Sequence, residues 1–118
     1  MQAEEGVMAD REDAALMVQL AQWGAMIGLQ QAEKALLSDD FDPDTASSDD
    51  DNVVTVCNFY ETVGTLTKNG LLSTELVLDW LWVSGVWARV APAVVKLRAK
   101  HGVAALMENF EALAAQQN

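Results

Sequence analysis

The chain has 118 residues and a mass of 12.8 kDa, the size of a single domain, and we expect one domain over residues 1–118. It combines 51% hydrophobic residues with a net charge of −11, which excludes an acidic disordered protein, since such proteins are poor in apolar residues. The same charge argues against nucleic acid or an anionic membrane surface as partner. One cysteine and no basic start followed by an apolar run predict a cytoplasmic location.

The negative charge is concentrated in the first half of the chain. Residues 1–52 hold 13 acidic and 2 basic residues, whereas residues 53–118 hold 5 of each. Seven of the acids lie between Asp39 and Asp51. Adaptation to high salt would scatter carboxylates over all surfaces, so this concentration favours a local role for the Asp39–Asp51 segment.

Residues 10–37 are predicted to form the first helix, after a disordered stretch over residues 1–9. Apolar residues recur there every three or four positions, at Leu16, Leu20, Trp23 and Ile27. A second stripe consists of small residues, Ala21, Gly24, Gly28 and Ala32. Small side chains let another backbone approach closely, so this stripe is expected to touch a neighbouring helix, with contact between two copies as the alternative.

Residues 38–52 are predicted to form a long acidic loop, because they combine Pro43 with serines, a threonine and aspartates. Asp51 or Asn52 would then cap a second helix over residues 53–69. Gly70 provides the stop, since glycine adopts the left-handed conformation that ends helices.

A third helix is predicted from Ser73, a good N-cap residue, to the His101-Gly102 stop. Its apolar stripe alternates spacings of four and three: Leu76, Trp80, Val83, Trp87, Val90, Val94 and Leu97. Residues 84–85 or 91–92, the latter containing a proline, are expected to break or kink it. A last helix should follow over residues 103–115, with Val103, Leu106, Phe110 and Leu113 inward.

The fold class that follows is all-α, a single-domain bundle of four to five helices with residues 53–116 as its core. Two apolar stretches are candidates for membrane spans. Residues 14–29 fall short of the roughly 20 that a span needs, and residues 76–95 contain Asp79, Arg89 and Pro92. Both are interpreted as buried helices, with no membrane span in the chain.

Several short motifs in the second half are similar to those of a known family: Asn58-Phe59-Tyr60-Glu61, Gly64, Gly70-Leu71-Leu72, Trp87, Pro92, Arg98 and Phe110-Glu111. Over residues 53–113 the chain resembles a family of small helical bacterial proteins known only as a domain of unknown function. The resemblance implies a bacterial helical module of unassigned activity, without catalytic residues to carry over.

The sequence offers no catalytic constellation. One histidine and one cysteine cannot supply the ligands of a Cys/His zinc site, and no glycine-rich phosphate-binding motif occurs. Cys57 lies among apolar residues and is interpreted as an inert, buried thiol, and His101 as a helix-end residue. Glu61 is expected to form an ion pair with Arg98 or Arg89. We therefore expect a protein that is not an enzyme and has no cofactor.

The leading hypothesis is a helical interaction or oligomerisation module, a homo-oligomer or a protein that docks on an unidentified protein partner. Four residues are the candidates for partner contacts. Trp82 falls off the apolar stripe and is expected to be exposed, as aromatic residues of subunit interfaces are. Arg89, Lys96 and Lys100 are expected on the solvent-facing side of their helix, where they could meet the Asp39–Asp51 segment of the same or a neighbouring chain.

The alternative hypothesis is Ca²⁺ binding by the acidic loop. Its oxygen-bearing residues fall at positions 1, 3, 5, 9 and 12 of an EF-hand-like pattern: Asp40, Asp42, Asp44, Ser48 and Asp51. The pattern departs from the motif at position 6, where Thr45 replaces the glycine of the sharp turn. A third hypothesis, an acidic mimic of DNA, needs carboxylates on a rigid surface, whereas these are predicted on a loop.

Overall fold

The residues that the structure describes, 9–117, form six helices and no strand in this computed structural model. In chain order the helices are α1 (Arg11–Ile27), α2 (Leu29–Leu36), α3 (Asp51–Lys68), α4 (Thr74–Trp80), α5 (Val83–His101) and α6 (Glu108–Ala115). The prediction of an all-α fold is confirmed, whereas the predicted number of four to five helices is too low. The expected disorder of residues 1–9 concerns positions that, apart from Ala9, lie outside the described residues.

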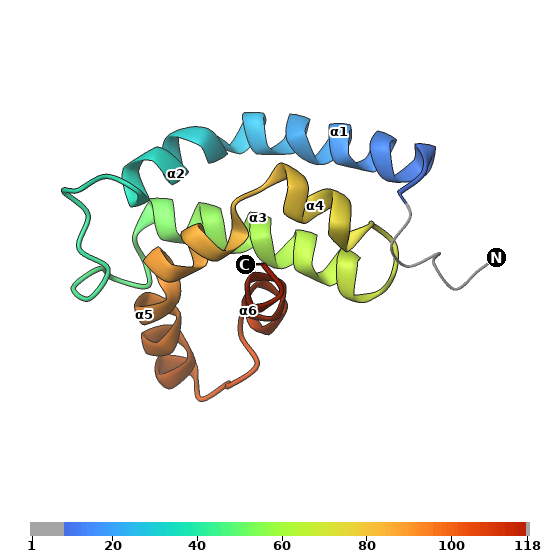
Figure 1. Ribbon diagram of the computed structural model, residues 1–118. Coiled ribbons are helices and arrows are strands. Elements are labelled where there is room, and N and C mark those ends of the chain that lie inside the picture. Colours follow the sequence, from blue (N-terminus) through green and yellow to red (C-terminus); the bar gives the residue numbers. More distant parts are fainter. Residues whose placement is uncertain (1–8, 118) are drawn as a thin grey trace.

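The helix predicted over residues 10–37 is two helices. Asp10 begins α1 through a capping box, in which Asp10 and Asp13 each accept a hydrogen bond from the other's backbone N–H at 2.9 Å. Gly28 ends α1 because it adopts a φ of 76°, which glycine reaches without a Cβ clash. α2 begins at the next residue, and the two helices follow each other along one side of the molecule (Figure 1).

α3 packs against α2, α5 and α6 and supplies a row of completely buried side chains, Val56, Phe59 and Val63. This row has the three- and four-residue spacing of one helix face. The helix begins earlier than predicted, because Asp50 is the N-cap and its carboxylate accepts from the N–H groups of residues 52 and 53. Gly70, with a φ of 72°, follows its end as predicted.

Gly64 lets α6 lie close against α3. A Cβ at this position would sit 2.5 Å from the carbonyl oxygen of Asn109, far inside van der Waals contact. The close approach brings Phe110 of α6 onto Tyr60 of α3, with stacked rings 4.9 Å apart. Trp87 of α5 meets the same Phe110 edge-on at 4.9 Å, so three helices share one aromatic cluster.

The helix predicted from Ser73 to His101 is also two helices. Ser73 caps α4 as predicted, since its hydroxyl accepts from the N–H of Leu76 at 3.1 Å. The break falls at Leu81 and Trp82 rather than at residues 84–85. Leu81 has the extended conformation, which ends the hydrogen-bonded ladder of α4.

α5 continues through Pro92, and its ribbon changes direction along its length (Figure 1). A proline removes one hydrogen bond and crowds the preceding turn, which accounts for a bend without a break. Gly102 ends the helix as predicted, with a φ of 65°. The expectation of a last helix from residue 103 is wrong: α6 begins at Glu108, and Val103 is 44% exposed rather than buried.

The first turns of α5 and α6 are capped by side chains from distant positions. The N-cap residues of both helices make no side-chain cap. Instead, the N–H of Ser84 in α5 donates to Oε1 of Gln117 at 2.7 Å, and the N–H of Phe110 in α6 donates to Oε1 of Glu61 at 2.9 Å. These contacts satisfy donors that a helix start otherwise leaves unpaired.

The expected ion pair between Glu61 and Arg98 or Arg89 is wrong, because Glu61 serves α6 instead. Arg98 pairs with Glu111, with Nη2 and Oε1 2.8 Å apart. The two apolar stretches considered as membrane spans are each divided between two helices. None of the helices described is long and apolar enough to cross a membrane.

Candidate functional site

Arg89 fastens the connection between α2 and α3, residues 37–50, to α5. Its Nε donates to the carbonyl oxygen of Leu36 at 2.6 Å, and its Nη2 donates to those of Ser38 and Phe41 at 2.9 Å each. The guanidinium also lies 5.4 Å from the centre of the Phe41 ring. The expectation that Arg89 faces solvent is therefore wrong; it is half-buried and bound to its own chain.

Two lysines further along α5 extend this attachment. Nζ of Lys96 donates to the carbonyl oxygens of Asp44 and Ala46, each at 2.9 Å. Nζ of Lys100 lies 3.4 Å from Oδ2 of Asp49, in an ion pair whose side chains are 55% and 74% exposed. The basic side of α5 therefore meets residues 37–50 of the same chain (Figure 1).

Trp82, the remaining candidate for partner contacts, is 62% exposed, as expected. Its indole lies over Gly85, where an added Cβ would come within 2.1 Å of the ring. A glycine one turn on is therefore what lets the ring lie flat on α5. As partner contacts, Trp82, Arg89, Lys96 and Lys100 stay a prediction.

The five residues of the predicted Ca²⁺ loop make separate contacts and do not form one ligand cluster. Oδ1 of Asp42 accepts from the N–H of Asp44 at 3.0 Å, and Asp51 belongs to the first turn of α3. The carboxylates of Asp40 and Asp44 are on exposed residues, and Ser48 is half-buried. Within residues 9–117 no three His, Cys, Asp or Glu side chains are grouped so that they could hold a metal ion.

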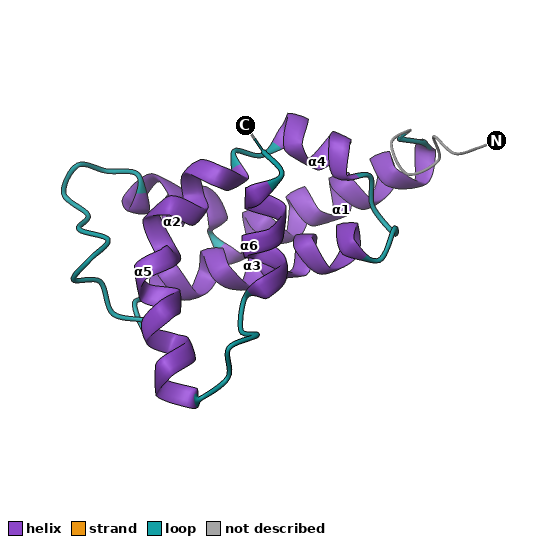
Figure 2. Ribbon diagram, turned by 60° about the horizontal axis from the view of Figure 1, so that its bottom comes forward, coloured by secondary structure: helices purple, strands orange, loops and turns teal. Residues whose placement is uncertain are grey.

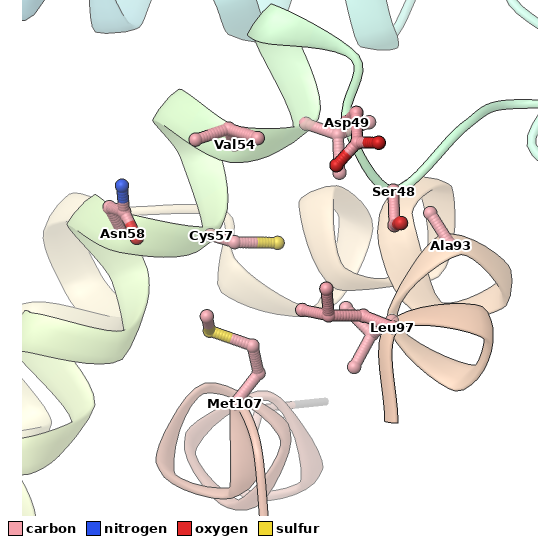
Figure 3. Close-up of a pocket in the computed structure, with 10 residues that line it drawn as sticks. Ser48, Asp49, Val54, Cys57, Asn58, Ala93, Leu97 and Met107 are labelled. Carbon is pink, nitrogen blue, oxygen red and sulfur yellow. The ribbon is translucent and has the colours of Figure 1, made fainter. Parts of the chain in front are cut away.

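A cavity of about 200 Å³ lies where α3, α5 and residues 37–50 meet. Ten residues line it: Ser48, Asp49, Val53, Val54, Cys57, Asn58, Ala93, Val94, Leu97 and Met107. Figure 3 shows the sulfur of Cys57 and the side chain of Met107 pointing into it from opposite elements. No pattern in the sequence indicates this cavity, because its walls come from four separate segments of the chain.

The Cys57 thiol in this cavity stays protonated at neutral pH. Burial, with a smaller contribution from the negative charge of Glu61, raises the pKa of Cys57 to about 12. A thiol is a poor nucleophile compared with a thiolate, so the position favours the predicted inert role. The environment of Cys57 suits an apolar contact rather than bond formation.

Met107 has the only positive φ of a non-glycine residue in the part of the chain described, 60°. Side chains adopt this conformation at a cost, and such residues occur often at binding sites. Met107 lines the cavity and is the N-cap of α6, so the unusual conformation falls where the connection from α5 (Figure 2) joins α6. No local sequence signal marks it, because methionine is not a residue that favours left-handed positions.

The exposed side of α1 is mostly apolar and carries no charge beyond the first turn of the helix. Only Leu20 and Gly24 of its 17 residues are buried, and Leu16, Trp23 and Ile27 pack partly against the core. The opposite side exposes eight residues between Ala14 and Met26. Five of them, which we call the outer face, are Ala14, Val18, Gln22, Ala25 and Met26. The signal was present in the sequence, since residues 14–32 contain no charged residue in a chain of net charge −11.

The chain was compared with known families, curated proteins and solved structures. A model of the family described as Domain of unknown function (DUF4760) matches residues 2–117. The resemblance first seen over residues 53–113 thus extends across nearly the whole chain. No curated protein and no solved structure matches it. The chain belongs to the DUF4760 family.

Proposed function

We propose that this domain is a non-enzymatic helical module that self-associates through the outer face of α1. The observation that carries the proposal is how little of this helix is buried: two of its 17 residues are buried, and beyond the first turn it presents an uncharged, mostly apolar side to solvent. Helical stability in proteins comes mostly from packing of an apolar face. The rest of the chain packs against only part of α1. A second copy bound to the outer face would supply further packing.

The choice of a second copy rests on charge. Two chains of net charge −11 repel each other, and the repulsion is strongest where aspartates face aspartates. The outer face avoids this cost, because no charged residue lies between Asp13 and Glu33. A two-fold axis across α1 would place the same uncharged surface on both copies, as closed dimers require.

The side chains of the outer face also suit close contact. Met26 is 84% exposed and Val18 is 52% exposed, and each would leave water on association. Ala14 and Ala25 leave room for a facing helix to approach.

The non-enzymatic part of the proposal is supported by how the chain uses its reactive groups. Cys57 is buried with a raised pKa, and Glu61 accepts hydrogen bonds from α6. His101 occupies the last position of α5, where a positive charge suits the helix dipole.

Sedimentation velocity across about a hundredfold range of concentration tests the proposal, since association follows mass action. The double substitution Val18→Asp and Met26→Asp is expected to weaken the dimer about a hundredfold or more, as loss of central apolar contacts does. Val95→Asp is the matched control, because Val95 is 61% exposed on α5. A wild-type chain that stays monomeric throughout, or a double variant that dimerises as wild type does, would contradict the proposal.

A further inference from the structure

The cavity between α3, α5 and residues 37–50 has an apolar interior. Four of its lining residues are nearly inaccessible to solvent: Val53 at 3%, Cys57 at 4%, Ala93 at 0% and Val94 at 1%. Leu97 and Met107 complete the apolar walls (Figure 3). Water is held inside proteins by two to four polar partners, and these walls offer few. An apolar occupant therefore matches the interior better than water does.

The volume of the cavity further limits which molecules could bind in it. A cavity of about 150 Å³ lined by aliphatic side chains binds benzene in another protein, and this one measures about 200 Å³. The space suits one or two small rings or a short alkyl chain. It is too small for a helix or for several side chains of a peptide.

The rim of the cavity is polar and holds both signs of charge. Ser48, Asp49 and Asn58 stand at its edge, and Lys100 lies 3.4 Å from the Asp49 carboxylate. Because this ion pair neutralises the rim, neither an anion nor a cation is favoured. A single hydrogen-bonding group on the occupant could still reach the serine or asparagine side chain.

The backbone at Met107 is a second and independent observation. Its positive φ of 60° is a strained conformation for methionine, and it directs a flexible, polarisable side chain to the cavity (Figure 3). Methionine adapts its shape to different apolar contacts. The strain falls at the one lining residue supplied by the α5–α6 connection.

We propose that this cavity is a binding site for a small uncharged molecule with an apolar body and at most one hydrogen-bonding group. Val53, Cys57, Ala93 and Val94 form its floor, and Met107 lines it from the α5–α6 connection. Ser48 and Asp49, in the connection that Arg89 and Lys96 hold on α5, form one edge of the site. No residue of α1 lines the site, so it does not depend on the proposed self-association.

Indole and 1-hexanol are suitable probes, with hexanoate as the charged control for 1-hexanol. At a probe concentration ten times its Kd, binding is expected to raise the melting temperature by about 5 °C. Cys57 is the only cysteine of the chain, so alkylation by iodoacetamide reports on this one site. Because its thiol is buried and its pKa is raised to about 12, the reaction is slow and is followed over hours at pH 9. The bound probe is expected to slow this alkylation about tenfold, in proportion to the fraction of empty sites.

Two variants distinguish this site from general apolar adsorption. Val54 is 41% exposed at the mouth of the cavity, so Val54→Trp should block entry while leaving the core in place. Val95→Trp is the control, because Val95 is 61% exposed and does not line the cavity. The rise in melting temperature and the slower alkylation of Cys57 should both persist in Val95→Trp and disappear in Val54→Trp.

A measurement on the wild-type protein keeps the test independent of how the variants fold. Nuclear Overhauser effects between indole protons and the Met107 methyl group are expected, since that side chain faces the cavity (Figure 3). Absence of these contacts at probe concentrations that shift the melting temperature would overturn the proposal. Equal protection of Cys57 by hexanoate and 1-hexanol would overturn the preference for an uncharged molecule.

Discussion

The carboxylate of Glu61 in α3 accepts a hydrogen bond from the backbone N–H of Phe110 in α6, with Oε1 2.9 Å from the nitrogen. The second oxygen, Oε2, accepts from Nδ2 of Asn109 at 3.0 Å. A negative charge at a helix start also interacts favourably with the helix dipole. One side chain thus joins α3 to α6 and replaces the cap that α6 does not have.

Replacing Glu61 with alanine should therefore weaken the docking of α6. We expect Glu61→Ala to lower the free energy of unfolding by about 2 kcal/mol, because it leaves the N–H of Phe110 unpaired and removes one of the two acceptors of the Asn109 amide, the other being Thr65. Glu111→Ala is the control, since the Glu111 side chain is 50% exposed in its ion pair with Arg98 and should contribute less than about 1 kcal/mol. Urea denaturation measures both, and equal losses would contradict the capping role.

Two glycines should respond differently to the same substitution. Gly64→Ala would press a Cβ against the backbone of Asn109, which cannot move without displacing α6, and should cost about 2–3 kcal/mol of stability. Gly85→Ala meets only the exposed indole of Trp82, which can swing into solvent, so stability should change by less than about 1 kcal/mol. Thermal melts would measure the stability of both variants, and the NMR signal of the Trp82 indole would report its movement in Gly85→Ala. A stable Gly64→Ala variant would mean that α6 can move away from α3 at little cost.

Arg89→Lys tests the attachment of residues 37–50. Lysine keeps the charge but lacks the planar fork that reaches three carbonyl oxygens, so we expect a loss of about 2 kcal/mol. Hydrogen exchange should accelerate first between α2 and α3, where the contacts are lost. Lys100→Met, which removes only an exposed ion pair, should change stability by less than about 1 kcal/mol. If lysine supports residues 37–50 as well as arginine does, the carbonyl contacts contribute little.

Alkaline pH should destabilise the fold in a way that depends on Cys57. Burial, with the charge of Glu61, raises the pKa of its thiol from 9.0 to about 12. The unfolded chain therefore loses this proton first as the pH rises, and the free energy of unfolding falls from about pH 9 to pH 12. Cys57→Ala should remove the part of this decline that begins near pH 9.

Tyr60 adds to the same decline at higher pH. Burial, a hydrogen bond to Glu33 and the charge of Glu33 all raise the pKa of its hydroxyl above the ordinary value of 10.0. Its contribution to stability is complete below pH 10 and is lost as the pH rises further. Urea denaturation at a series of pH values tests both residues, and stability unchanged between pH 9 and 11 would contradict these assignments.

Calcium should have no specific effect on the fold. The aspartates proposed as ligands are used as separate turn and helix-start residues, so Ca²⁺ and Mg²⁺ at equal concentration should raise the melting temperature equally. A rise that is specific to Ca²⁺ and disappears in Asp42→Asn would restore the calcium hypothesis.

Helix ends set by local chemistry could be predicted from the sequence. Gly70, Ser73 and Gly102 end or begin helices where predicted, because a left-handed glycine or a capping hydroxyl acts within one turn. Gly28 was assigned to a packing stripe, although it uses its freedom of φ to end α1. A glycine in an apolar pattern is compatible with either role.

Contacts across many residues could not be predicted in the same way. The bonds from Arg89 to residues 36–41 end on backbone oxygens, which have no signature in the sequence. The charge pattern did indicate that the basic side of α5 and the Asp39–Asp51 segment could meet, but not that carbonyl groups make most of the bonds. The cavity has no signature in the sequence either, because four separate segments form its walls and Met107 reaches it through a backbone conformation that its residue type does not favour.

The attachment of residues 37–50 through carbonyl oxygens has an evolutionary consequence. Every amino acid has a carbonyl group, so substitutions at positions such as 38, 41, 44 and 46 retain the acceptors that α5 requires. Related proteins could therefore vary the aspartates of this connection while keeping its path, provided that the arginine and lysine of α5 remain. The path of the connection is therefore determined by side chains of α5, some fifty positions further along the chain.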